Sequence, residues 1–173
     1  CYNNLGSLYF AQKDNLRALD YHHKSLKIKK EIGFIKGEAI SLYHLGDVYL
    51  SVEDYHKALN YYNSSLEKLK FINSQKRIGV VLCKLGNCLY KMEKYQKAIQ
   101  MYKESEKILD RLGYLNELLK PIEGLFALYK SNETFPKALE YHEKFISIKD
   151  SLDKIDGIEK EKQRLIHEKY LLK

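Results

Sequence analysis

LYHLGDVYLSVEDYHKALNYYNSSL, residues 42–66, is the stretch that decides the fold. Apolar residues recur in it three and four positions apart, first in Leu42, Leu45 and Val48 and again after Asp54. This spacing is typical of amphipathic helices. Asp54 interrupts the apolar stripe, and aspartate is a residue type that caps the start of a helix. The stretch therefore predicts two helices joined by a short turn at Asp54.

The same pattern returns at intervals of forty residues along the chain. Its counterparts are residues 2–26, 82–105 and 121–145. One column of the resulting alignment is invariant and holds Ala18, Ala58, Ala98 and Ala138. Another column, which follows an invariant leucine, holds Gly6, Gly46, Gly86 and Phe126. A fixed period of this size predicts an array of stacked helix pairs.

Small residues in these columns have a steric explanation. Two antiparallel helices approach closely only where one of them presents a methyl group or a hydrogen. Leucine in place of Ala58 would overpack such a crossing, at a cost of about 1–3 kcal/mol. The array should therefore lose much of its stability when a large side chain replaces a residue of the alanine column.

Further columns predict where the helices begin and end. Residue types that readily adopt the left-handed conformation of a helix C-terminus occupy one column, which holds Gly33, Asn73, Gly113 and Asp153. Helix-capping types precede three of the second helices, at Asp14, Asp54 and Thr134. Both prolines, Pro121 and Pro136, are expected near helix starts, where a missing amide proton is harmless.

These rows resemble the tetratricopeptide repeat family. The family pattern of large residue, leucine–glycine, tyrosine, tyrosine, alanine and tyrosine is met in order by Leu42, Leu45, Gly46, Tyr49, Tyr55, Ala58 and Tyr62. The usual family period is about 34 residues, so the forty-residue rows are similar to the long-repeat subclass of kinesin light chains, spindle-orientation adaptors and bacterial peptide-sensing regulators. The resemblance implies an all-α, right-handed α-solenoid of four antiparallel helix pairs, with repeats at 1–38, 39–78, 79–118 and 119–153.

The last repeat and the tail depart from the pattern. Phe126 replaces the glycine, and Phe145 stands where the earlier rows have serine, so the packing should change there. Residues 154–173 are expected to form a C-terminal capping helix over the fourth repeat. Alternatively, this tail begins a coiled-coil linker, because Ile158, Leu165 and Leu172 are spaced by sevens.

Composition excludes several classes of function. The net charge of +7 is spread over the chain, and four arginines are too few for a regular phosphate-binding stripe, so we expect no nucleic acid partner. Three cysteines and six histidines show no metal-ligand spacing, and no glycine-rich phosphate loop is present. We therefore expect no enzyme activity, no cofactor and no metal. No apolar run could span a membrane, and a cytoplasmic location is the default expectation.

The resemblance also implies a binding groove on the concave face of the first helices of the repeats. Carried over position by position, its residues are Asn3, Asn4, Ser7, Phe10, Tyr43, His44, Asp47, Leu50, Cys83, Lys84, Asn87, Tyr90, Glu123 and Ala127. Asparagine both donates and accepts, which suits the carbonyl and amide groups of a peptide backbone. Tyr43 and Tyr90 would supply apolar walls, and Lys84 beside His44 would meet a carboxylate.

One departure limits the ligand. The asparagine that the family carries at the position of Asn4 is replaced by His44, Lys84 and Gly124 in the later rows. The replacement favours a shorter peptide, a helical partner, or a groove continued in further repeats over a long extended peptide.

Three functions follow from the sequence. The first is a non-enzymatic protein- or peptide-binding scaffold, as one part of a larger protein. The second is a sensor module upstream of a bacterial histidine kinase or transcription regulator, and the third, least favoured, is a nucleic-acid binder. Self-association through the array ends or the C-terminal helix is a further expectation about partners.

Overall fold

The computed structural model describes residues 2–171, and the side chains of residues 2–164. Every element in this part of the chain is an α-helix, and successive helices are separated by three residues. The helices are α1 Tyr2–Ala11, α2 Asn15–Glu31, α3 Ile35–Ser51, α4 Tyr55–Phe71, α5 Gln75–Lys91, α6 Tyr95–Arg111, α7 Leu115–Ser131 and α8 Phe135–Leu171.

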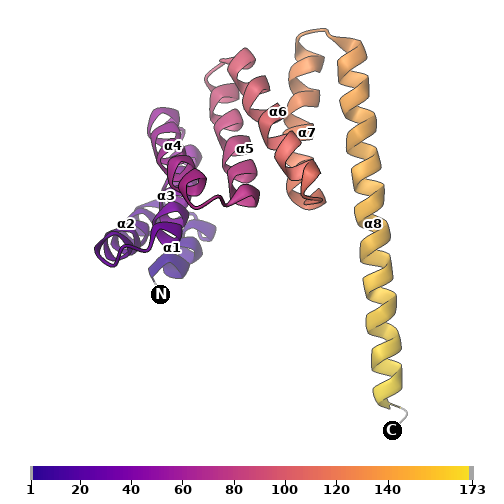
Figure 1. The fold of residues 1–173 in the computed structure, drawn as a ribbon, viewed down its shortest axis with the longest axis horizontal. Coiled ribbons are helices and arrows are strands. Elements are labelled where there is room, and N and C mark those ends of the chain that lie inside the picture. Colours follow the sequence, from indigo (N-terminus) through magenta and orange to yellow (C-terminus); the bar gives the residue numbers. More distant parts are fainter. Residues whose placement is uncertain (1, 172–173) are drawn as a thin grey trace.

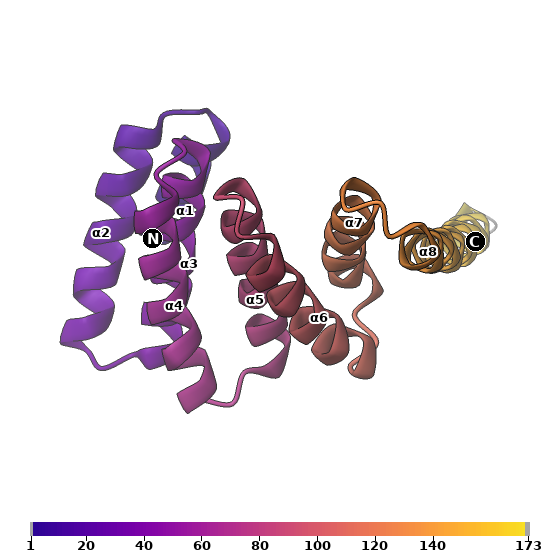
Figure 2. The same ribbon diagram turned by 90° about the horizontal axis from the view of Figure 1, so that it is seen from above.

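The helices pack as four pairs, α1–α2, α3–α4, α5–α6 and α7–α8, and each pair also packs against the next one. Figure 1 shows the two helices of each pair side by side, and Figure 2 shows the pairs following one another in chain order along the molecule. The all-α solenoid of four helix pairs that the sequence predicts is therefore confirmed.

The turns between helices use the left-handed conformation at one position each. Between pairs this residue is Gly33, Asn73 or Gly113, with φ of 65°, 50° and 70°, so three of the four predicted stop positions are confirmed. In the turns within pairs the left-handed residues are Lys13, Glu53, Glu93 and Glu133. Both kinds of turn close with a bond from the next amide back to the preceding helix, as in a Schellman motif.

The predicted helix caps are confirmed in the first two pairs and wrong in the fourth. Asp14 and Asp54 each accept a hydrogen bond from a backbone amide three residues later, at 3.1 Å. Thr134 precedes α8, but its hydroxyl donates backward to the carbonyl of Asn132 at 3.3 Å. Thr134 therefore bonds the turn that precedes α8 rather than the first amides of that helix.

Helix starts lie earlier than the repeat boundaries in the sequence suggested. The first helices of the second, third and fourth pairs begin at Ile35, Gln75 and Leu115, so boundaries at 38/39, 78/79 and 118/119 fall four residues into a helix. Pro121 consequently lies inside α7 and not near its start. It deprives the carbonyl of Glu117 of an amide donor there, a cost that α7 tolerates with Pro121 buried.

The glycine column is explained by aromatic rings that lie directly over it. A Cβ atom added to Gly46 would stand 2.6 Å from the ring of Tyr62, and one added to Gly86 would stand 2.7 Å from the ring of Tyr102. At Gly6 the clash would be with His22, at 2.6 Å. The alanine column is likewise buried, so the predicted close approach at both columns is confirmed.

A buried serine reinforces the two middle pairs. Ser65 donates to the carbonyl of Ala39, and Ser105 donates to the carbonyl of Gly79, both at 2.7 Å. The fourth pair has Phe145 at this position, as the sequence shows, and therefore lacks the bond. The predicted change of packing in the last repeat is present at this position.

The separate capping helix is absent, because α8 continues without a break through Asp153. Ile155 and Ile158 are 53 % and 70 % exposed, and Figure 1 shows the end of α8 extending well past α7. The described side chains of this extension therefore do not cover the fourth pair. Leu165 and Leu172, on which the coiled-coil alternative also depends, lie outside the described side chains. No helix in the described part of the chain is long and apolar enough to cross a membrane.

Candidate functional site

The candidate site is the inner face, which we define as the face formed by α1, α3, α5 and α7. Helix α1 contacts α3, and α5 contacts α7, across the boundaries between pairs. Direct contacts of this kind among the first helices indicate that the array curves toward them. A curved array of this type presents an extended concave surface.

An ion pair connects the second and third pairs on this face. Lys84 Nζ lies 2.8 Å from Asp47 Oδ1, and the hydroxyl of Tyr62 donates to the same oxygen at 2.6 Å. Burial lowers the pKa of Lys84, but the Asp47 carboxylate outweighs it, so the net shift is upward. Lys84 is therefore charged, and its charge is already matched by Asp47 instead of being left for a ligand.

Tyr43 and His44 flank this ion pair. The Lys84 ammonium lies 5.7 Å from the ring centroid of Tyr43, and burial raises the pKa of Tyr43 to about 12. His44 stacks on His22 with ring centroids 5.0 Å apart, and burial lowers its pKa. Tyr43 lines a pocket between α3 and α5, whereas a neutral His44 offers no second positive charge beside Lys84.

Asn87 occupies the position equivalent to Asp47 in the next pair. Its side-chain oxygen accepts a hydrogen bond from the hydroxyl of Tyr102 at 2.6 Å. In the first pair Asn3 is engaged similarly, since its oxygen lies 3.2 Å from the Nδ1 atom of His22. The side-chain oxygen of each asparagine thus has a partner within the fold, and the amide donor of each remains to contact a peptide backbone.

Two pockets on the inner face share Asn87 and Tyr90. One, of about 280 Å³ between α5 and α7, is lined by Asn87, Tyr90, Tyr102, Lys120, Glu123, Gly124 and Ala127. The other, of about 270 Å³ between α3 and α5, is lined by Leu50, Ser51, Glu53, Tyr55, Asn87, Tyr90 and Lys91. The structure therefore brings the predicted residues Leu50, Asn87, Tyr90, Glu123 and Ala127 together.

The predicted residues of the first pair do not join this group. Asn4 is exposed, while Ser7 and Phe10 are half-buried on α1. None of them lines either of the pockets that Asn87 shares. The candidate site is consequently centred on the second to fourth pairs.

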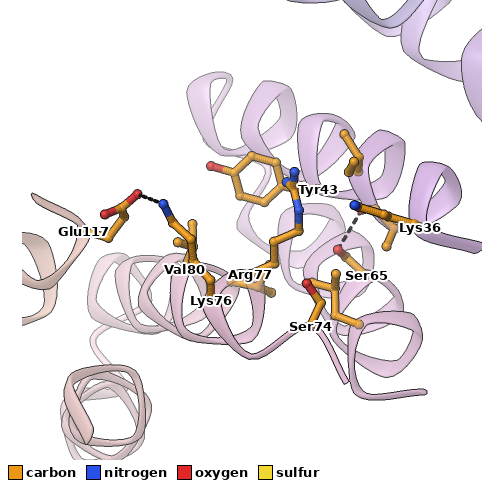
Figure 3. Close-up of a pocket in the computed structure, with 12 residues that line it drawn as sticks. Lys36, Tyr43, Ser65, Ser74, Lys76, Arg77, Val80 and Glu117 are labelled. Atoms are coloured by element: carbon orange, nitrogen blue, oxygen red, sulfur yellow. Dashed lines mark hydrogen bonds and ion pairs between the residues drawn. The ribbon is translucent and has the colours of Figure 1, made fainter. Parts of the chain in front are cut away.

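A third pocket, of about 470 Å³, was largely missed from the sequence (Figure 3). It is lined by Lys36, Ala39, Ile40, Tyr43, Ser65, Leu69, Ser74, Lys76, Arg77, Val80, Val81 and Glu117, of which the family pattern assigned only Tyr43. Lys36, Lys76 and Arg77 lie in the first turns of α3 and α5, ahead of the repeat boundaries placed from the sequence. The forty-residue period could have indicated these residues, because a longer repeat has room for an additional helical turn at the start of each first helix.

The thiols and acids of the inner face are not arranged for metal binding or nucleophilic chemistry. Cys83 and Cys88 are buried, and burial raises the pKa of each to about 12, so both remain thiols. In the described part of the chain no cluster of histidine, cysteine, aspartate and glutamate could hold a metal ion.

Comparisons with solved structures find the same fold. BtubC (BKLC) from P. vanneervenii matches with a TM-score of 0.79 and 22% identity, over 88% of this chain and 63% of that one. The apo form of RapI matches with 0.83 and 21%, over 88% and 56%. Aspartyl phosphate phosphatase F from Bacillus subtilis matches with 0.85 and 17%, over 88% and 40%. The chain thus spans less than two thirds of each of these proteins.

Sequence comparisons identify the repeat itself. A search of curated proteins finds no match. Tetratricopeptide repeat models match residues 2–70 and residues 80–117, which cover the first three helix pairs almost completely. The matched segments contain the first three members of the alanine column and all three glycines of the glycine column. Together with the solenoid of helix pairs, these matches show that the chain belongs to the tetratricopeptide repeat family.

Proposed function

We propose that the chain is a non-enzymatic scaffold that binds a protein or peptide segment on its inner face. The observation that carries the proposal is the pair of adjoining pockets that share Asn87 and Tyr90. Together they extend from Leu50 on α3, across α5, to Ala127 on α7. Two adjoining pockets across three repeats suit a short chain segment rather than a single small molecule.

The chemistry of the shared residues supports a peptide ligand. Tyr102 holds the Asn87 oxygen, so the amide group of Asn87 is oriented as a donor toward a backbone carbonyl. Tyr90 is 37 % exposed beside it and offers an apolar ring with a polar tip. Lys120 and Glu123 at the α7 side supply one charge of each sign, 3.3 Å apart.

This arrangement also limits the length of the peptide that the inner face can hold. The amide donor of Asn87 has no equivalent in the second pair, where Asp47 is engaged by Lys84 and Tyr62. A peptide backbone would therefore be held by hydrogen bonds at the third pair and by side-chain contacts on either side. This supports the expectation of a short ligand.

The proposal predicts that removing both shared side chains abolishes binding. Short synthetic peptides of random sequence are displayed and selected against the whole chain, and the enriched peptides are then measured with the Asn87→Ala, Tyr90→Ala double variant. We expect affinity to fall at least tenfold, because both pockets lose a wall and the backbone donor disappears.

A matched control separates binding from folding. Asn60 and Phe71 lie exposed on α4, away from the inner face, and Phe71 is 78 % exposed. The Asn60→Ala, Phe71→Ala variant likewise replaces one asparagine and one aromatic residue by alanine, and it should bind as the unmodified chain does. Unchanged affinity in the Asn87 and Tyr90 variant, with helicity preserved in both, would place the ligand elsewhere.

A further inference from the structure

The pocket between α3 and α5 that Figure 3 shows has an apolar interior. Ala39, Leu69 and Val81 form buried parts of it, at 0%, 2% and 1% exposure. Ile40 and Val80 are half-buried at its sides. An opening of about 470 Å³ with such a lining accommodates a large apolar side chain of a ligand.

Three positive charges surround this apolar interior. Lys76 is neutralised, because its Nζ atom lies 2.6 Å from Glu117 and 4.0 Å from the ring centroid of Tyr114. Lys36 and Arg77 are exposed, and neither forms an ion pair or a side-chain hydrogen bond with another described residue. The pocket therefore has two unneutralised cations, one contributed by α3 and one by α5.

We propose that this pocket binds an apolar side chain of a peptide together with a neighbouring aspartate or glutamate, whose carboxylate pairs with Arg77 and Lys36. This inference rests on the proposed function and names the chemical class of its ligand, an acidic peptide. The guanidinium group of Arg77 presents two parallel donors that match a carboxylate. The apolar interior supplies the contact area that two exposed charges alone would lack.

The lining favours a peptide over a nucleic acid. Binding of single-stranded nucleic acid relies on aromatic rings that are open for base stacking. The one aromatic side chain of this lining is Tyr43, which is half-buried and already contacts His44, Tyr62 and Lys84. A base therefore finds no free ring face in the pocket, whereas an aliphatic side chain needs none.

The test uses two pools of short peptides and the whole chain. In the acidic pool a central large apolar residue is flanked by aspartate and glutamate, and in the matched pool asparagine and glutamine replace the acids. We expect the acidic pool to bind about tenfold more tightly, with an advantage that shrinks as salt rises. Replacing the central apolar residue by glycine should remove binding in both pools.

Charge reversal at Lys36 and Arg77, which we call the rim of the pocket, gives the second readout. The Lys36→Glu, Arg77→Glu variant should lose the preference for the acidic pool and bind it about tenfold more weakly. Folding should be preserved, because glutamate is favourable in the first turn of a helix and both positions lie in first turns. The control Lys27→Glu, Lys107→Glu carries the same net charge on exposed positions of α2 and α6, and should keep the preference.

The outcomes separate this inference from the proposed function. If the acidic pool binds the rim variant and the unmodified chain equally, while the Asn87 and Tyr90 variant is impaired, the acidic pocket is wrong and the scaffold stands. If no peptide of either pool binds while the peptides selected from random sequences still do, the acidic pocket is wrong and the scaffold stands. If the selected peptides fail as well, both proposals are wrong. Binding of a single-stranded DNA probe that the rim variant abolishes, without peptide binding, would instead assign the pocket to nucleic acid.

Discussion

The two middle helix pairs and the fourth pair share the alanine column, but different contacts join the two helices of each pair. In α3–α4 and α5–α6 a tyrosine lies over a glycine and a buried serine donates to the first helix. The fourth pair has Phe126 against His142 instead, with ring centroids 5.1 Å apart. Its second helix, α8, forms an ion pair with the preceding pair, in which Lys144 Nζ lies 2.6 Å from Glu106 Oε1 of α6.

This comparison shows which contacts define a repeat and which belong to its neighbours. The middle pairs are closed internally by contacts of identical geometry, so each can stack on a similar pair. The fourth pair depends more on α6 than on an internal serine bond, and its second helix then leaves the array as a long exposed extension. Differences in stability between equivalent positions should follow this division.

The largest expected effect concerns the histidines that replace the tyrosine in the outer pairs. His22 is 1 % exposed and burial lowers its pKa to about 4, whereas His142 is exposed. Because unfolded His22 takes up a proton near pH 6.5 and folded His22 does not, stability should fall between pH 6.5 and pH 4. The loss is about 3 kcal/mol, from a shift of this size.

The groups around His22 sharpen this test. His44 and Lys29 oppose its protonation and Asp47 favours it, while Asn3 contacts its ring from α1. The free energy of unfolding, measured with urea at several pH values in this range, should depend less steeply on pH in His22→Tyr than in the unmodified chain. This variant carries the tyrosine that the middle pairs have at the same position. Equal slopes in the unmodified chain and His22→Tyr would contradict the assignment.

The next effect concerns glycines inside helices. Gly46→Ala should destabilise the chain by about 1–2 kcal/mol, because the clash with the buried ring of Tyr62 exceeds the roughly 1 kcal/mol gained in helix propensity. Gly157, in the extension of α8, has open space around its position. Gly157→Ala should therefore stabilise the helix by up to about 1 kcal/mol.

Thermal unfolding of the two variants measures this difference directly. The opposite signs expected at Gly46 and Gly157 come from packing alone, since the substitution is the same and both positions are helical. A stabilised Gly46→Ala variant would show that Tyr62 can move aside and that the glycine column is not a packing requirement.

Much of the fold was predictable because its determinants are periodic. Ala58 and Gly46 are visible in the sequence as columns, and the steric reason for each column is general. Pro121 was misplaced because the columns set the helix starts too late, and α7 in fact begins at Leu115. Thr134 does lie directly before α8, but its hydroxyl bonds the preceding turn instead of the first amides of the helix. The break expected at Asp153 failed because aspartate tolerates a left-handed turn without requiring one, and an uninterrupted helix continues there.

The site was less predictable than the fold. The family pattern named Asn87 and Tyr90, and both line the two adjoining pockets, because groove positions recur with the repeat. It could not show that Asp47 and Lys84 pair with each other, since that contact joins different repeats. Nor could it identify Arg77, which lies in the first turn of α5, ahead of the repeat boundary that the columns set.

The smallest expected effect tests the extension of α8. Ile155→Asp with Ile158→Asp should change the stability of the monomer by no more than about 0.5 kcal/mol, since both side chains are largely exposed. A contact with the fourth pair, as in the capping helix expected from the sequence, would make the loss several times larger. Light scattering on the same variant tests the coiled-coil alternative separately, because two charges in an apolar stripe would dissociate a dimer held by the extension. An unchanged mass together with unchanged stability would leave α8 beyond Leu152 as a helix that serves neither the packing of the array nor its self-association.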